Sequence, residues 1–197
     1  MSKYLPAIIT GFVVALIVGF GVGFLLSSLG APDFRLALMT GAGAGVVTAY
    51  VRANLAGNRK LSNASEADKR AALGRTPPTG KALVFLYREG FVAKLAGLNL
   101  ALDGREVVQL QAPRFTCVAV PEGSHTLTAV FGGFAGAQSN PSELKFDAPR
   151  DGAVAVRITM AFGMVKGGIT LTLQPDLAQA KLAMASMAMT PADVAEL

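Results

Sequence analysis

Two side chains in this sequence are of types that could do chemistry, the single histidine His125 and the single cysteine Cys117. One of each is too few for a His/Cys metal cluster, so we expect no metal site. Cys117 lies within an apolar run, which predicts a buried, inert thiol, because reactive cysteines need a basic and exposed setting. His125 follows a Pro-x-Gly turn, a position that favours a turn or cross-strand hydrogen bond.

The glycine-rich run Gly132-Gly133-Phe134-Ala135-Gly136 could in principle cradle a phosphate. Phosphate-binding loops continue into Gly-Lys-Ser/Thr and a helix, and this run does not, so we interpret it as a loop tip. Tyr87, Arg88, Phe91 and Lys94 could form a surface patch for a partner, although solvated strand edges would explain them equally well. Because no nucleophile–base pair or carboxylate pair stands out, the sequence predicts no catalytic residues, no cofactor and no enzyme.

Two apolar segments near the N-terminus precede the residues discussed above and anchor the rest of the chain. Leu5 to Leu29 has no charged residue, and as a helix it would be about 37 Å long, enough to cross a hydrocarbon core of about 30 Å. A second block, Leu36 to Val51, is shorter and is flanked by arginines that can snorkel outward. We therefore predict a membrane hairpin of two transmembrane helices over residues 1–53. A cleaved signal peptide is the alternative, but its apolar region would usually be about 7–15 residues.

Glycines recur at small-xxx-small spacing in both segments, as Gly19 and Gly23 and as Gly41 and Gly45. Such spacing lets helix backbones approach closely in lipid, so we expect these four residues to pack helices. Two interpretations stay open, namely packing of the two helices within one hairpin and self-assembly of several hairpins. Neither segment contains an ionisable residue, which argues against a proton or ion relay.

Basic residues cluster after the second apolar segment. We predict that they bind anionic lipid headgroups, at about 1 kcal/mol per residue near the surface. Nucleic-acid binding is not expected, because the cluster has no interleaved aromatic residues. Since cytoplasmic flanks carry the positive excess, we expect a bacterial inner (cytoplasmic) membrane protein with both termini in the cytoplasm. The residues assigned to headgroup binding are Arg52, Arg59, Lys60, Lys69 and Arg70.

A basic polar linker with a short helix, residues 54–80, leads to a region where the apolar period changes to two. Seven or eight short strands follow, separated by turn signals such as Asp103-Gly104 and Pro121-Glu122-Gly123. The predicted fold of residues 81–174 is an all-β sandwich. The whole chain is then a transmembrane α-helical hairpin plus an all-β sandwich domain with a C-terminal helix.

Part of this region resembles a known family. The runs Leu98-Asn99-Leu100-Ala101-Leu102-Asp103-Gly104-Arg105 and Val120-Pro121-Glu122-Gly123-Ser124-His125-Thr126-Leu127 look like PEGA-type domains, and more closely like a related, uncharacterised bacterial lipoprotein-type domain. The resemblance covers about residues 81–131. It implies a small β-sandwich with a structural or binding role. This chain departs from the lipoprotein relatives in having an apolar hairpin and no lipid-bearing cysteine.

The tail, residues 175–197, is rich in alanine and methionine and is expected to be helical from Asp176 to Met189. Met184 and Met187 lie about one turn apart and are candidate partner-binding residues. The tail could instead pack on its own β domain or rest on the membrane. Thr190 followed by Pro191 predicts a second short helix with Thr190 as its N-cap.

Two functions are compatible with these features. The first is a non-enzymatic structural, scaffold or accessory subunit that is anchored in the membrane and oligomerises or joins a larger membrane complex. Its partners would be the lipid bilayer and either copies of itself or other subunits. The alternative is a membrane-tethered ligand-binding or sensory β-sandwich module. A pore built of assembled hairpins would need a polar lining, which the two apolar segments hardly offer.

Overall fold

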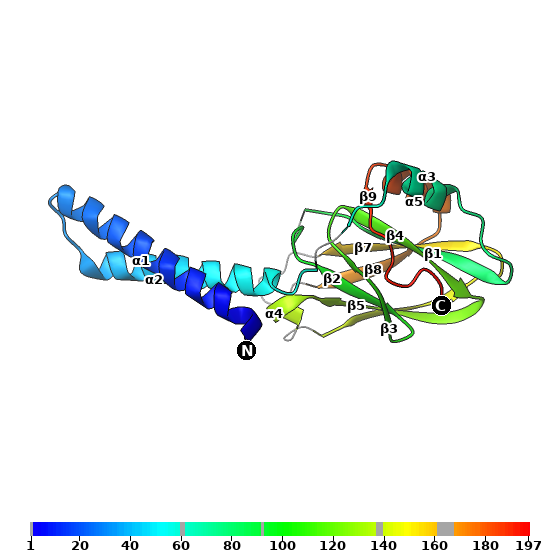
Figure 1. Cartoon of the computed structure of the whole chain (residues 1–197), viewed down its shortest axis with the longest axis horizontal. Coiled ribbons are helices and arrows are strands. Elements are labelled where there is room, and N and C mark those ends of the chain that lie inside the picture. Colours follow the sequence, from blue (N-terminus) through cyan, green and yellow to red (C-terminus); the bar gives the residue numbers. More distant parts are fainter. Residues whose placement is uncertain (1, 60–61, 92, 137–139, 161–167) are drawn as a thin grey trace. The chain divides into compact units, whose positions relative to one another are not determined.

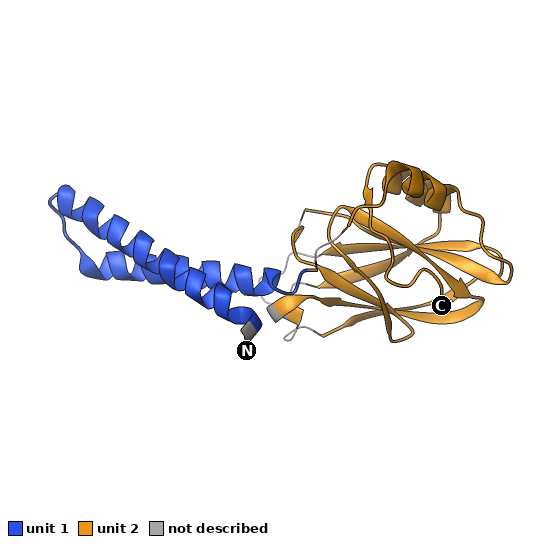
Figure 2. Ribbon diagram, viewed as in Figure 1, with its two compact units in different colours: residues 1–58 blue, residues 59–197 orange. Residues whose placement is uncertain are grey.

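The computed structural model describes residues 2–59, 62–91, 93–136, 140–160 and 168–197. The chain forms two compact units, residues 1–58 and residues 59–197 (Figure 2). The sequence-based linker, residues 54–80, is thus divided between the two units, and most of it belongs to the second.

The first unit is a hairpin of two apolar helices, α1 (Leu5–Ser28) and α2 (Phe34–Leu55), preceded by the short η1 (Ser2–Tyr4). Asp33 begins α2, because its side chain accepts a hydrogen bond from the Leu36 amide at 3.0 Å. Gly30 reverses the chain with a φ of 74°, which glycine adopts without strain. Both helices are long and apolar enough to cross a membrane.

Glycines bring the two helices of the hairpin into backbone contact. A Cβ on Gly41 would lie 2.5 Å from the Ala15 carbonyl oxygen, and one on Gly45 would lie 2.6 Å from the Gly11 oxygen. Gly11 is equally crowded, with the Gly45 oxygen at 2.6 Å. These positions accept no side chain without moving a helix, so close packing within the hairpin depends on them.

The second unit is mostly β structure in two sheets (Figure 1). The five-stranded sheet has the order β8-β7-β1-β4-β9, and the four-stranded sheet has the order β3-β2-β5-β6. The sequence-based expectation of a β domain with two sheets is confirmed. The strands are β1 (Lys81–Arg88), β2 (Leu98–Leu102), β3 (Arg105–Leu110), β4 (Arg114–Pro121), β5 (Gly123–Phe131), β6 (Ser142–Ala148), β7 (Ala153–Met160), β8 (Ile169–Gln174) and β9 (Ala188–Met189).

Strand β1 is buried on both faces and organises two hydrophobic cores. Ala82, Val84 and Leu86 point between the sheets, where they pack against residues of β2 and β5. The alternate residues Leu83 and Phe85 point to the other face of the five-stranded sheet, which helices cover. This double burial explains why β1 has an unbroken apolar run where half-buried strands alternate.

Helices α3 (Glu66–Gly74) and α5 (Leu177–Ala185) lie over the five-stranded sheet (Figure 1). Ser65 caps α3 by accepting from the Asp68 amide, and Asp176 caps α5 by accepting from the Gln179 amide. A four-residue helix, α4 (Gly133–Gly136), forms where the sequence predicted a glycine-rich loop tip.

The final segment corrects the prediction of a helical tail, because α5 ends at Ala185, Ala188–Met189 form strand β9, and residues 190–197 form no helix after Thr190. They run instead as an extended strap beside β4, with the Leu197 amide bonded to the Ala119 carbonyl at 2.9 Å. The Thr190 amide donates to the Phe115 carbonyl in the same way. A helix here would forfeit these bonds to the sheet edge, so tertiary pairing prevails over the local capping pattern.

Candidate functional site at the entry end of the β domain

One end of the β domain receives the chain from the hairpin, and we call it the entry end. It comprises residue 59, residues 62–64, the described part of the β1–β2 loop (residues 89–91 and 93–97) and residues 111–113. Hydrogen bonds attach these segments to β3, to β9 and to one another. They are Arg59 amide to Gln109 Oε1 (2.6 Å), Ala64 amide to Met189 carbonyl (2.9 Å) and Ala112 amide to Lys94 carbonyl (3.3 Å).

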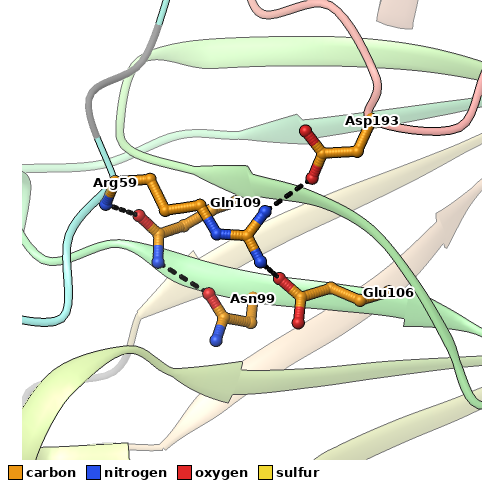
Figure 3. Close-up of polar contacts among 5 residues, drawn as sticks. All are labelled: Arg59, Asn99, Glu106, Gln109 and Asp193. Carbon is orange, nitrogen blue, oxygen red and sulfur yellow. Dashed lines mark hydrogen bonds and ion pairs between the residues drawn. The ribbon is translucent and has the colours of Figure 1, made fainter.

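Arg59, the first residue of the domain, is fastened to two other parts of it (Figure 3). Its Nη1 donates to Asp193 Oδ2 at 2.7 Å, and its Nη2 pairs with Glu106 on β3. Gln109, which accepts from the Arg59 amide, also donates to Asn99 Oδ1 at 2.7 Å. Because these ions are about half exposed, each pair adds little stability. Together they join the incoming chain, β3 and the C-terminal strap.

Arg88 is the central polar group of the entry end, and its side chain is fully buried. Its guanidinium donates to the Leu110 carbonyl at 3.0 Å, to the Ala93 carbonyl at 2.8 Å and to the Ala96 carbonyl. Burial lowers the pKa of Arg88 to about 10, which still leaves the group protonated at neutral pH. A buried cation is tolerated here because three carbonyl dipoles converge on it.

The hydrogen bonds from Arg88 fasten the β1–β2 loop while its large apolar side chains point into solvent. Gly90 and Ala93 have positive φ values, 97° and 51°, so the loop turns sharply around the guanidinium. Two large apolar side chains remain on the outside, Phe91 at 87% exposure and Leu95 at 65%. Exposed apolar residues of this size are few on the described surface of the second unit, so the loop presents a small apolar tip.

Sequence reasoning captured only part of this loop. The sequence was compatible with Tyr87, Arg88, Phe91 and Lys94 forming a surface patch or lying on solvated strand edges, and the structure separates them. Phe91 and Lys94 are exposed, whereas Tyr87 and Arg88 are buried. An arginine at the end of an apolar strand normally indicates a solvent boundary. Its burial depends on the loop folding back over it, which no local pattern signals.

His125 lies at the opposite end of the domain, where it joins two turns. Its Nδ1 is 2.6 Å from Asp103 Oδ2 in the β2–β3 turn, and its Nε2 is 2.9 Å from the Pro121 carbonyl oxygen. The expected turn hydrogen bond is therefore confirmed. Both ring nitrogens face acceptors, an arrangement that suits the doubly protonated imidazolium.

The His125–Asp103 pair predicts a pH dependence of stability. Burial lowers the pKa of His125, but hydrogen bonds to Asp103 and Pro121 outweigh it, and the pKa is raised above its ordinary value of 6.5. A raised histidine pKa gives stability that is complete below the unfolded value and is lost as pH rises through the folded value. We expect the free energy of unfolding to fall by about 1 kcal/mol or less between pH 6 and pH 8.5, since Asp103 is half exposed.

Urea unfolding of the full chain at several pH values would measure this loss. The matched control is His125→Asn, which cannot take up a proton in this range and should show no such fall. A wild-type stability that increases from pH 6 to pH 8.5 relative to the variant would contradict the assignment.

Cys117 lies on β4 under α5, in the core between the five-stranded sheet and the helices. Desolvation raises the pKa of its thiol to about 11, against smaller opposing effects of Arg75 and Lys181. The thiolate is the reactive form, so alkylation by iodoacetamide at pH 8 should be at least about a hundredfold slower than in urea. Mass spectrometry of labelled protein checks this, and equal rates in native and denatured protein would refute it.

The structure places the four predicted helix-packing glycines along the hairpin. Gly41 lies against Ala15 and Gly19, and Gly45 lies against Gly11. Gly23 has only an ordinary contact, since a Cβ added there would lie 3.5 Å from the Ala37 Cβ. Packing within one hairpin thus accounts for Gly19, Gly41 and Gly45, the first of the two interpretations. Gly11 completes the crossing, although its spacing did not single it out.

The predicted lipid-binding cations have varied surroundings within the two units. Arg52 donates to Thr10 Oγ1 at 3.1 Å in the hairpin. Lys69 pairs with Glu66 at 3.5 Å, and Arg70 donates to the Glu66 carbonyl. Arg59 is held by Glu106 and Asp193 as described, and Lys60 lies outside the described residues. Headgroup binding by this cluster stays a prediction.

Met184 and Met187, the predicted partner-binding residues, are buried at 0% and 6% exposure. Met184 lies on the buried face of α5, and both methionines pack with Phe115 and Cys117 of β4, so the tail covers its own sheet in the structure. The burial of these two methionines agrees with the alternative prediction that the tail packs on its own β domain.

Among the described residues, no group of three or more histidine, cysteine, aspartate or glutamate side chains could hold a metal ion. The fold and the entry end define a class of protein, a hairpin of two apolar helices continued by a two-sheet β domain. No family model matches the chain. No curated protein matches it either. The PEGA-type resemblance of residues 81–131 therefore stays a prediction.

Proposed function

We propose that this chain is a non-enzymatic structural or accessory subunit of a bacterial inner membrane, crossing the bilayer twice with both termini in the cytoplasm. The observation that carries the proposal is the short connection between α2 and the β domain. Helix α2 ends at Leu55, and Arg59 is already bonded to Gln109 of β3. Four Cα–Cα steps of 3.8 Å span about 15 Å at most.

This connection favours a scaffold over a freely tethered module. If α2 ends at the bilayer surface, the first bonded residue of the β domain lies within about 15 Å of it. Because Arg59 is paired with Glu106 and Asp193, the connection between α2 and the β domain is limited to the residues between Leu55 and Arg59. The domain is thereby held at the membrane, as a structural subunit requires. A sensory domain on a long flexible linker would sample a much larger volume.

The proposed assembly with other subunits is supported by the surface of the hairpin. An apolar groove of about 620 Å³ runs between α1 and α2, and its lining includes Phe20, Phe24, Phe34 and Leu38. An apolar helix of a second copy would fill it with the close packing that stabilises helices in lipid. The internal use of Gly41 and Gly45 leaves this groove free for such a contact.

Membrane insertion and orientation are tested on the full chain in bacterial cells. The proposal expects the protein to stay in the membrane fraction after alkaline carbonate extraction. Trypsin should digest the β domain in inside-out vesicles and leave it intact in spheroplasts. A chain released by carbonate, or a domain cleaved in spheroplasts, would overturn this part of the proposal.

Assembly is tested by mass determination of the native protein after gentle solubilisation. The proposal expects a defined homo-oligomer or a complex with other membrane subunits. A Leu38→Asn variant, which places an amide in the groove, should lower the mass to that of a single chain. A wild-type chain that is monomeric at every detergent concentration would favour the ligand-binding alternative instead.

A further inference from the structure

The apolar tip of the β1–β2 loop has no role in the fold of the β domain. Phe91 and Leu95 are 87% and 65% exposed, so neither side chain contributes to either hydrophobic core. Removing two such side chains from water in another environment would be favourable. Two hydrogen bonds from Arg88, to the Ala93 and Ala96 carbonyls, fasten the described part of the loop, and a third, to Leu110, joins the same guanidinium to β3.

The position of this tip within the domain restricts what can cover it. The Ala112 amide bonds to the Lys94 carbonyl, so the loop lies beside the C-terminal end of β3. Gln109, near that same end of β3, receives the Arg59 amide. The tip and the first residue of the domain therefore occupy the same end of the sandwich. Only three residues separate that first residue from α2.

The charged residues of the loop favour contact with an anionic surface. Glu89 is neutralised by Arg157, whose Nε lies 2.7 Å from the glutamate oxygen. Lys94, which lies between Phe91 and Leu95 in the sequence, is exposed. An apolar tip with an exposed lysine suits the interface of an anionic bilayer, where apolar side chains enter about 5–10 Å and a lysine meets the phosphates.

From these observations we propose that the β1–β2 loop is a membrane-inserting tip, with Phe91 and Leu95 entering the interface of an anionic lipid bilayer and Lys94 binding its headgroups. This proposal rests on the membrane anchoring proposed above. It adds a second attachment point, because the domain is then held both by α2 and by its own loop. Buried Arg88 acts as a positioning residue that keeps the tip outward.

The chain has no tryptophan, so a single tryptophan is a clean reporter of lipid contact. The experiment uses the full chain in nanodiscs of phosphatidylcholine and phosphatidylglycerol with brominated acyl chains. Phe91→Trp and Leu95→Trp place the reporter at the tip. The matched control is Leu173→Trp, an exposed leucine on the edge strand β8, which is separated from β1 by β7. All three sites tolerate a larger side chain because they are exposed.

The proposal expects brominated lipid to reduce the fluorescence of the two tip reporters about twofold and to leave the Leu173→Trp signal unchanged. Replacing phosphatidylglycerol by phosphatidylcholine, or adding Lys94→Glu, should weaken the quenching. Tip reporters that acrylamide quenches fully in water would overturn the proposal. Tip reporters shielded from both acrylamide and brominated lipid would also overturn it, because a protein partner would then cover the tip.

Failure of this inference is distinguishable from failure of the anchoring. If α1 and α2 do not insert, the chain does not enter the nanodiscs and carbonate releases it from membranes, which overturns both proposals. If the chain inserts but the tip reporters remain in water, the anchoring stands and the loop proposal alone is wrong.

Discussion

Replacing Arg88 by methionine is expected to lower the free energy of unfolding of the β domain by about 3 kcal/mol. Methionine fills much of the same volume, so the loss comes from the hydrogen bonds and not from a cavity. The carbonyls of Ala93, Ala96 and Leu110 would lose their donor in a buried setting. Each unsatisfied acceptor costs about 1 kcal/mol or more. The β1–β2 loop should loosen as well.

Cys117 provides the measurement, because its buried thiol becomes reactive only when the domain opens. Pulsed thiol labelling across a urea series on the full chain in detergent gives the unfolding midpoint. Hydrogen exchange of residues 93–97 reports the loop separately. Arg88→Lys should have an intermediate effect, since an ammonium keeps the charge but cannot span three carbonyls with fixed geometry.

A matched control is available on the neighbouring strand. Arg157 also lies at the entry end of the five-stranded sheet, but its side chain is 47% exposed and pairs with Glu89 at the surface. Arg157→Met should cost about 0.5 kcal/mol, as exposed ion pairs do. Equal midpoints for Arg88→Met and Arg157→Met would show that the hydrogen bonds of the buried guanidinium do not stabilise the domain.

Much of the fold could be predicted from local patterns. The apolar lengths predicted two neighbouring helices, and the Gly41 and Gly45 spacing predicted close helix packing, although it left open whether the partner helix belongs to the same hairpin. Asp103 followed by Gly104 indicated a two-residue turn, and the structure gives both a positive φ. These features depend on residues close together in sequence, where spacing alone determines the geometry.

The remaining features depend on contacts between distant segments. Residues 59–64 were expected to be linker because they are polar, yet Arg59 and Ala64 bond to residues 50 and 125 positions further on. Met184 and Met187 could face a partner or their own sheet, and the helix spacing could not decide between the two. Arg88 shows the same limit, since its burial is produced by a loop that follows it.

Replacing Gly41 by alanine is expected to destabilise the packed hairpin by about 2 kcal/mol. The added Cβ would lie 2.5 Å from the Ala15 carbonyl oxygen and 2.8 Å from the Gly19 Cα, both backbone atoms. Because these atoms cannot rotate away, the helices must separate and lose dispersion contacts along the whole crossing. Alanine favours helix over glycine, so helix propensity alone predicts the opposite sign.

Gly43 supplies the control, because a Cβ there meets nothing within 4 Å. Gly43→Ala should leave hairpin packing unchanged or slightly stabilise it through helix propensity. Nitroxide labels at Ile8 and Tyr50, both exposed, in a Cys117→Ala background would report the distance between the helices during an SDS titration. The Gly41→Ala hairpin should open at a lower SDS mole fraction than wild type and Gly43→Ala. Identical opening of all three proteins would mean that the glycines serve contacts between hairpins, which is the interpretation that the structure does not require.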